Sequence, residues 1–356
     1  MKVSNLYNKI TNLNVIMNMY DYTVRINTKN KEKVEKFDNF YSQNIVSIKD
    51  VLAGKKYYPG RYNIFLIKEP KVRVIMSQNI KDKIVNHLVA QYFLVDVFDK
   101  SLINSNCATR VGKGAYYALK LFKRYYNNMI NNYKKFYVLK FDISKYFYNI
   151  DHEIVKELIR NKISDKGVLD ILDRIIDSTD NDYINKKINS LGDNLPNYKK
   201  RKGFPIGNMT SQIIATFYLN ELDHFIKEKL GIKYYIRYMD DGILLHHDKE
   251  YLKYCLKEIE KILYKYKLEL NRKTKIYSSS ESIDFLGFSF SYNKRVISKV
   301  KTSVKKRIKT RLNKKYNLYK DGIITYDKYR GIRDSYIGHL SHGNCGNLCF
   351  LILKKN

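Results

Sequence analysis

Two adjacent aspartates, Asp240 and Asp241, lie between two short apolar runs in the segment Y-I-R-Y-M-D-D-G-I-L-L, residues 235–245. Apolar residues on both sides of a short polar stretch predict a β-hairpin with the carboxylates at its tip. Neighbouring carboxylates repel each other, and partial burial raises their pKa unless a cation compensates the charge. Divalent metal ions would supply that compensation, although Asp-Asp-Gly is also an ordinary turn sequence.

A third carboxylate, Asp142, closes a predicted strand in V-L-K-F-D-I-S, residues 138–144. If both elements belong to one antiparallel sheet, Asp142 and Asp240 can converge. Such a group of oxygen ligands, with the carbonyl of Ile143 added, suits two Mg²⁺ ions, and Mn²⁺ is an alternative. Two metal ions side by side stabilise the attacking and leaving oxygens of a phosphoryl transfer. The three aspartates therefore predict this reaction.

The charge balance of the chain predicts a polyanionic partner. Among 356 residues, 67 are Lys or Arg and 35 are Asp or Glu, a formal net charge of +32. Such a surplus favours nucleic acid, because each neutralised phosphate releases counterions. A biased base composition explains the preference for Lys over Arg but not the shortage of acids. Four scattered cysteines, no signal peptide and no membrane-spanning run predict a cytoplasmic protein.

Several elements must position these side chains. We predict a hairpin over 61–76 with its turn near Glu69 and Pro70, a long helix after the loop 203–208 with Thr210 or Ser211 as its cap, and a basic helical module over 291–356. The other expected elements are a helix over 80–99, a loop leading into a basic, Tyr-rich helix over 108–130, a strand that becomes a helix over 136–163, a helix and polar connection over 166–200, a helix over 248–267 and a strand pair over 268–290.

The motifs occur in an ordered series that resembles the reverse transcriptases of the bacterial, group II intron-like superfamily. Besides Y-M-D-D, the series consists of I-K-E-P-K-V-R-V-I (67–75), A-T-R-V-G-K-G-A-Y-Y-A-L (108–119), F-D-I-S-K-Y-F-Y-N-I-D-H (141–152), G-F-P-I-G-N-M-T-S-Q (203–212), L-N-R-K-T (270–274) and F-L-G-F (285–288). The resemblance implies a mixed α/β (α+β) right-hand polymerase. It would have an N-terminal extension (1–58), fingers (59–135 and 160–202), a palm with an antiparallel sheet and helices (136–159 and 203–290), and a helical thumb (291–356).

The resemblance also implies roles for single residues. Asp142, Ile143, Asp240 and Asp241 would hold the metals, and Lys273 would protonate the leaving pyrophosphate unless it is an ordinary solvated lysine. Phe147, five residues after Asp142, would exclude a ribose 2′-hydroxyl, although a Phe is more often a core residue. The remaining candidates are Lys71, Arg73, Ile206 and Gln212 at the incoming deoxynucleotide (dNTP), and Arg110, Lys113 and Gly287 at the nucleic acid. The segment F-L-G-F (285–288), which contains Gly287, would be the primer grip.

Within the superfamily, the loop sequence I-G-N-M-T-S-Q (206–212) resembles that of diversity-generating retroelement enzymes. These copy a template RNA mutagenically, form an RNA/DNA hybrid and act with a small basic accessory protein. The alternatives are a defence-associated reverse transcriptase that copies a noncoding RNA against phage, a group II intron-type enzyme, and an inactive RNA-binding scaffold. His339, His342, Cys345 and Cys349 have metal-like spacing, but the family's thumb explains this segment without zinc.

Overall fold

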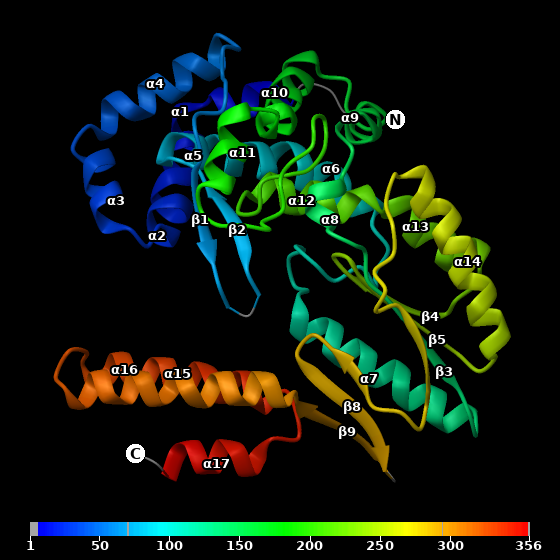
Figure 1. Cartoon of the computed structure of the whole chain (residues 1–356). Coiled ribbons are helices and arrows are strands. Elements are labelled where there is room, and N and C mark those ends of the chain that lie inside the picture. Colours follow the sequence, from blue (N-terminus) through cyan, green and yellow to red (C-terminus); the bar gives the residue numbers. More distant parts are fainter. Residues whose placement is uncertain (1–5, 70, 294, 355–356) are drawn as a thin grey trace. The chain divides into compact units, whose positions relative to one another are not determined.

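The chain divides into two compact units in the computed structural model, which describes residues 6–69, 71–293 and 295–354 (Figure 1). The first unit comprises Met1–Arg110, Asp142–Gly231 and Lys257–Arg272, and the second comprises Val111–Phe141, Ile232–Leu256 and Lys273–Asn356. Each unit therefore collects three separated stretches of sequence. Helix α14 (Lys249–Lys265) contains one of the crossings between them.

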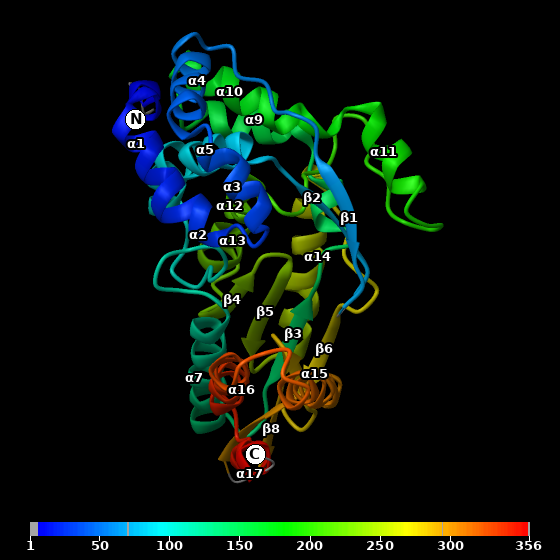
Figure 2. The ribbon, with the colours of Figure 1, turned by 90° about the vertical axis from the view of Figure 1, so that its left-hand side faces the viewer.

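A four-stranded antiparallel sheet belongs entirely to the second unit. Figure 2 shows its strands side by side in the order β4-β5-β3-β6, with helix α7 beside β4. The inner residues of β3, β4 and β5 are nearly all buried, which explains why these segments are mostly apolar. The bounds are α7 (Ala115–Asn132), β3 (Tyr137–Phe141), β4 (Tyr234–Tyr238), β5 (Asp241–His246) and β6 (Lys275–Ser278).

The rest of the second unit is a three-stranded antiparallel sheet followed by three helices. The sheet has the order β7-β8-β9, and the helices α15, α16 and α17 form the basic helical module predicted at the end of the chain. Their bounds are β7 (Ile283–Phe285), β8 (Phe288–Asn293), β9 (Arg295–Val300), α15 (Thr302–Lys320), α16 (Tyr326–Ser341) and α17 (Gly346–Lys354). Strand β9 lies at the start of the segment that was predicted to be helical.

The first unit contains the predicted hairpin. Strands β1 (Asn63–Ile67) and β2 (Arg73–Ser77) are antiparallel, and their buried side chains form a core with α11 and Tyr198. Pro70, where the turn was predicted, lies outside the described residues. The N-terminal region consists of η1 (Tyr7–Thr11), α1 (Leu13–Met19), η2 (Tyr20–Val24), α2 (Arg25–Asn27), α3 (Lys31–Asp38) and α4 (Tyr41–Ala53).

The remaining helices of the first unit follow the predicted order, with one addition. Helix α11 lies in the stretch that was predicted as a polar connection. The bounds are α5 (Ile80–Val89), η3 (Ala90–Val95), α6 (Asp96–Phe98), η4 (Asp99–Ser101), α8 (Tyr146–Asn149), α9 (His152–Arg160), α10 (Lys166–Ile176), η5 (Asp177–Thr179), α11 (Asp182–Asn189), α12 (Met209–Tyr218), α13 (Asn220–His224) and η6 (Phe225–Lys229).

The predicted cap of α12 was wrong. Thr210 and Ser211 lie inside the helix, and the residue before its first turn is Asn208. The amide group of Asn86 on α5 replaces a local cap, because its Oδ1 accepts from both the backbone N–H and the hydroxyl of Thr210. The N-terminus of α12 is thus satisfied by a distant helix.

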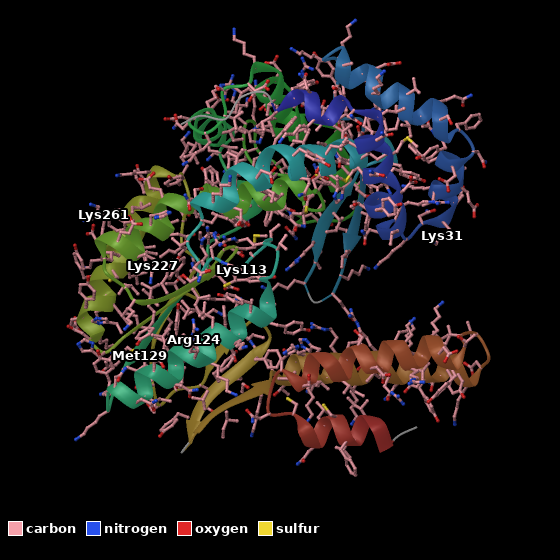
Figure 3. The ribbon with its side chains drawn as sticks, turned by 180° about the vertical axis from the view of Figure 1, so that it is seen from behind. Lys31, Lys113, Arg124, Met129, Lys227 and Lys261 are labelled. Atoms are coloured by element: carbon pink, nitrogen blue, oxygen red, sulfur yellow. The ribbon has the colours of Figure 1, made fainter. Side chains whose placement is uncertain are left out.

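Cationic side chains are distributed over both units. Figure 3 labels Lys31 and Lys261 on the first unit and Arg124 on the second, and all three are exposed. On helix α7, basic and apolar side chains differ in exposure, because Arg124 is exposed whereas Met129 is buried. No helix within the described ranges combines the length and apolarity needed to cross a bilayer.

Candidate active site

The tip of the β4–β5 hairpin carries both adjacent aspartates, as predicted. Tyr238 pairs with Asp241, so Met239 and Asp240 form a two-residue turn and Asp241 is the first residue of β5. Both aspartates are half-buried. Met239 has a φ of +57°, in the left-handed region, which costs a non-glycine residue about 1–3 kcal/mol. The turn is therefore strained and must be held by its surroundings.

Arg237 provides part of that hold, and our sequence analysis missed it. Its side chain is fully buried, with 0% of its surface exposed, and its Nη1 donates to the carbonyl oxygen of Met239 at 2.9 Å. A cation inside an otherwise apolar strand was the available signal, because arginine is almost never fully buried without a partner. Arg237 thus fixes the residue that precedes Asp240.

Gly242 is required by packing inside the sheet. It pairs with Phe141 across β3 and β5, and a Cβ atom at this position would overlap the Phe141 ring. The aromatic ring therefore lies where any other side chain would begin. A specific contact inside the sheet therefore explains the glycine of the Asp-Asp-Gly sequence. An ordinary turn would not need this contact.

Asp142 follows β3 directly and is held through its backbone. Its carbonyl oxygen accepts from the backbone N–H of Asn271 at 2.7 Å, and the next residue, Ile143, forms an antiparallel bridge with Leu270. The Asp142 side chain is half-buried. Phe141 pairs with Gly242 of the Asp-Asp-Gly segment, and Asp142 is the next residue after Phe141. Asp142 belongs to the first unit, and Asp240 and Asp241 to the second.

The predicted nucleotide-binding residues of the first unit come from segments that are bonded to one another. The backbone N–H of Met76 on β2 donates to the carbonyl of Ile206 at 3.0 Å, and the N–H of Phe204 donates to the carbonyl of Phe147 at 2.7 Å. The loop 203–208 therefore joins the β1–β2 hairpin to helix α8. Lys71 and Arg73, just before β2 and at its first position, are exposed.

A tyrosine behind this loop helps to fix it. Asn208 donates through its Nδ2 to the hydroxyl of Tyr62 at 3.1 Å, and the same hydroxyl lies 2.9 Å from the Ser178 hydroxyl. Burial raises the pKa of Tyr62 to about 12, so the hydroxyl stays neutral at physiological pH. The loop that carries Ile206 is thus anchored by neutral hydrogen bonds.

Three further predicted residues lie in positions compatible with contact to a ligand. Gln212 is exposed, whereas nearly every other residue of α12 is buried. Lys273 is exposed in the segment before β6. Gly287, with a φ of +87°, and Leu286, with a φ of +45°, form the tight turn between β7 and β8.

The structure gives Arg110 a different role from the predicted template contact. Its guanidinium forms an ion pair with Asp99 and also donates to the carbonyl oxygens of Ile103 and Asn106, and 9% of its side chain is exposed. Arg110 therefore organises its own loop. The candidate template contact in this loop that remains is Lys113, which is half-buried and lies over the Tyr117 ring in the second unit.

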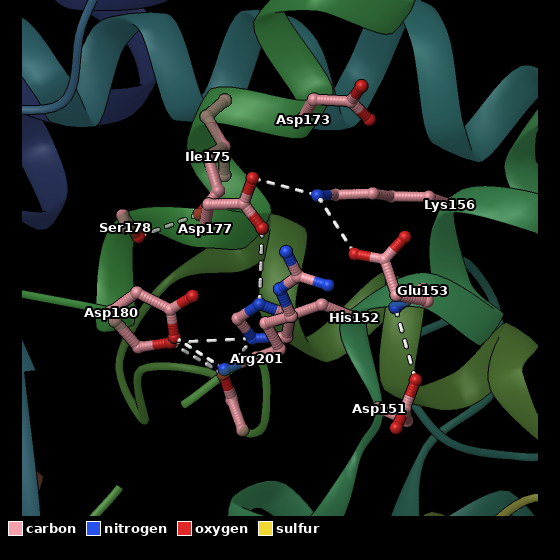
Figure 4. A network of polar contacts seen from close by, with 12 residues as sticks. Asp151, His152, Glu153, Lys156, Asp173, Ile175, Asp177, Ser178, Asp180 and Arg201 are labelled. Carbon is pink, nitrogen blue, oxygen red and sulfur yellow. Dashed lines mark hydrogen bonds and ion pairs between the residues drawn. The ribbon is translucent and has the colours of Figure 1, made fainter. Parts of the chain in front are cut away.

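A histidine–aspartate group in the first unit is distinct from the predicted metal residues. His152, Asp177 and Asp180 have potential ligand atoms within 4.8 Å of one another. Figure 4 shows that Asp177 faces both His152 and Lys156. His152 is also hydrogen-bonded through Nε2 to the carbonyl of Gly203, and the backbone N–H of Arg201 donates to Asp180. Because protein donors and acceptors already satisfy these groups, we interpret the network as a structural clamp on the loop 201–203.

Comparisons with known proteins agree with this arrangement of motifs. The family described as reverse transcriptase (RNA-dependent DNA polymerase) matches residues 67–290. The group II intron-encoded protein LtrA of Lactococcus lactis subsp. cremoris is 24% identical over 229 residues, which are 63% of this chain and 35% of that protein. The chain therefore spans about a third of the length of this curated relative.

Two solved structures were also similar to the chain. The apo telomerase of Candida tropicalis, truncated from its C-terminal domain, has a TM-score of 0.49 and 16% identity, covering 73% of this chain and 60% of that one. The telomerase of Candida albicans in complex with a telomeric RNA fragment has a TM-score of 0.47 and 13% identity, covering 75% and 52%.

The family match extends over well more than half of the chain and includes the strand before Asp142, the loop 203–208, the Asp240–Asp241 hairpin and the turn at Gly287. The predicted fold class is confirmed, because helices are combined with an antiparallel sheet that carries this hairpin. The chain belongs to the reverse transcriptase (RNA-dependent DNA polymerase) family.

Proposed function

We propose that this chain is an RNA-directed DNA polymerase that copies a template RNA into cDNA by two-metal phosphoryl transfer. The observation that carries the proposal is the β4–β5 hairpin, whose strained turn presents Asp240 and Asp241 beside the strand that leads into Asp142. The family match supports the same activity. Template RNA, the RNA/DNA hybrid and dNTPs are the partners that this activity requires.

The donor chemistry of the proposed site fits Mg²⁺ or Mn²⁺. Asp142, Asp240 and Asp241 offer carboxylate oxygens and Ile143 offers a carbonyl, all hard ligands of the kind these ions prefer. The three carboxylates are half-buried, so their oxygens are not sealed in the core. Bound metal would activate the primer 3′-hydroxyl and neutralise the leaving pyrophosphate. Asp142, Asp240 and Asp241 would hold the ions, and Asp241 would also orient the primer end.

Primer extension with the purified chain tests the proposal. An RNA template with an annealed DNA primer, dNTPs and Mg²⁺ should yield a DNA strand of template length, and chelation of the metal should stop the reaction. An inactive RNA-binding scaffold would bind the same duplex without extending it. Absence of extension from a folded protein that binds the duplex would contradict the proposal.

Phe147 should determine which sugar is accepted. Its ring is half-buried and packs edge-on against Tyr146 at the start of α8. Replacement of Phe147 by Ala should remove the steric obstacle to a 2′-hydroxyl and raise the relative use of ribonucleotides about tenfold or more, since about 1.4 kcal/mol of lost discrimination suffices. The ratio of kcat/KM for rNTP and dNTP measures this. Phe65→Ala, an exposed phenylalanine on β1, is the matched control and should leave the ratio unchanged.

For the biological role, we propose mutagenic copying in a diversity-generating retroelement, acting with a small basic accessory protein. The support is the loop sequence, in which half-buried Ile206 occupies a position where the intron-type enzymes have glutamine. An apolar side chain cannot donate a hydrogen bond to the nucleotide, so the geometry of the nascent pair is less constrained. The similarity to LtrA favours the intron-type alternative.

Sequencing of cDNA separates these roles. Wild-type product should carry errors opposite template adenines, and Ile206→Gln should reduce those errors several-fold while leaving the yield of cDNA within about threefold. Unchanged errors in the variant would contradict the role of Ile206. Repeats or homopolymers in cDNA made in cells would instead indicate a defence enzyme.

A further inference from the structure

Lys140 lies on the same face of the sheet as Asp241, although neither the motifs nor the family match assigns it a role. It is on β3, two residues before Asp142, and its register partner on β5 is Ile243. Because side chains alternate between the faces of a sheet, Ile243 and Asp241, two residues apart, share one face with Lys140. The Lys140 Nζ is 3.8 Å from Asp241 Oδ1, and the two side chains are 23% and 31% exposed.

The same ammonium group reaches a second element. Nζ of Lys140 donates to the carbonyl oxygen of Asp284 at 3.0 Å. Asp284 is the middle residue of β7, two positions before the β7–β8 turn at Leu286 and Gly287. That turn is the segment whose sequence predicts the primer grip. One lysine therefore contacts both a carboxylate of the catalytic hairpin and the strand that carries the primer grip.

Neighbouring lysines are engaged by other carboxylates. Lys275, the register partner of Lys140 on β6, forms an ion pair with Glu281 at 2.8 Å. Lys301 forms an ion pair with the Asp284 carboxylate at 2.6 Å, so Lys140 bonds the Asp284 backbone and not its side chain. Glu281 and Asp284 therefore pair with Lys275 and Lys301, whereas the carboxylate beside Lys140 is that of Asp241.

We infer that Lys140 is a positioning residue that ties Asp241 to the primer-grip strand β7 and offsets the negative charge of the aspartate pair. The inference rests on the proposed polymerase function. It has two separable consequences. Loss of the positive charge should strengthen binding of divalent cations at the aspartates, because Lys140 then no longer competes with them for the Asp241 carboxylate. Loss of the bridge should slow synthesis, because Asp241 and the primer end are no longer held together.

Five variants separate these consequences. Lys140→Met removes the charge and keeps the length of the side chain, and Lys140→Arg keeps the charge and changes the geometry. Lys275→Met is the matched control, since it removes one charge from the neighbouring strand of the same sheet. Asp241→Asn, alone and combined with Lys140→Met, completes a double-mutant cycle.

Binding of Mn²⁺ without nucleotide, followed by the electron paramagnetic resonance of the free ion, is the first measurement. Lys140→Met should lower the Kd for Mn²⁺ about three- to tenfold, a range set by a partly screened charge beside the site. Lys140→Arg and Lys275→Met should stay within about twofold of wild type. In the Asp241→Asn background the effect of Lys140→Met should shrink to less than about twofold.

Primer extension is the second measurement. Lys140→Met should lower kcat about tenfold or more, and Lys140→Arg should recover part of it. Wild-type values of both the Mn²⁺ Kd and kcat in Lys140→Met would overturn the inference, as would an equal Mn²⁺ effect with and without the Asp241 carboxylate. If the wild type itself makes no DNA, the proposed function fails, and the Mn²⁺ cycle still tests the coupling of Lys140 to Asp241.

Discussion

Replacement of Asp240 and Asp241 together by Asn should abolish cDNA synthesis while leaving RNA binding intact. Asparagine keeps the shape of each side chain, so the two-residue turn and the pairing of Tyr238 with residue 241 are preserved. What is lost is negative charge at the proposed metal ligands. Metal ions contribute several kcal/mol to phosphoryl transfer, so the rate should fall about 10³-fold or more.

RNA binding should not be lost together with activity, because the two substitutions make the protein more positively charged. The formal net charge of +32 includes only 35 acids, so removal of two carboxylates makes the protein more basic. Electrostatic attraction to phosphates should therefore be equal or slightly stronger. The affinity for a template–primer duplex, measured by fluorescence anisotropy at fixed salt, checks this beside the extension rate.

A matched control separates the site from the change in charge. Asp193→Asn combined with Glu35→Gln neutralises two exposed acids of the first unit, outside the hairpin, and should extend primers at the wild-type rate. Full-length cDNA from the Asp240→Asn, Asp241→Asn protein would show that the hairpin carboxylates are not the catalytic ligands.

The catalytic hairpin and its neighbours were predictable because the decisive information is local. Short apolar runs on each side of Asp240 and Asp241 determine two strands, and the apolar run before Asp142 determines a third. The order of the motifs then indicates the class of fold. Helix α11 was missed because its sequence is mostly polar. Its apolar residues Ile184 and Ile188, four positions apart, are both fully buried against the β1–β2 hairpin, a contact that the sequence does not reveal.

Partners that are distant in sequence or set by backbone geometry could not be predicted. Arg110 beside Gly112 resembled an exposed loop cation, but it pairs with Asp99, eleven positions earlier. The cap of α12 comes from Asn86, 124 positions away. The acceptor for Arg237 is the carbonyl of Met239, which is placed there by a left-handed backbone that residue type alone does not indicate. Arg110 was thus recognised without its partner, whereas the roles of Asn86 and Arg237 were not recognised.

Replacement of Arg237 by Met should both destabilise the protein and inactivate it. Methionine fills much of the buried volume but cannot donate to the Met239 carbonyl, which would be left without that hydrogen bond inside the protein. A hydrogen bond from a charged donor contributes about 1.5–3 kcal/mol, and the left-handed turn at Met239 would lose a restraint on its strain. The free energy of unfolding should therefore fall by about 2–4 kcal/mol.

The loss of activity should exceed what unfolding explains. Met239 directly precedes Asp240, so a turn that relaxes from its φ of +57° moves the carboxylates even when the strands remain paired. Displacement of a catalytic group by about 1 Å costs roughly a hundredfold in rate. Urea denaturation gives the stability, and extension rates measured well below the unfolding transition give the activity of the folded fraction.

Arg330→Met is the control for the chemistry of the substitution. Arg330 lies on α16 with 60% of its side chain exposed and forms a surface pair with Asp334 at 3.6 Å. Such pairs contribute about 0.5 kcal/mol or less, so this variant should unfold close to wild type. If Arg237→Met matched it in stability and extended primers normally, the buried guanidinium would not be what holds the turn. The strain at Met239 would then have to be supported by the pairing of β4 with β5 and by the packing of Gly242 on Phe141.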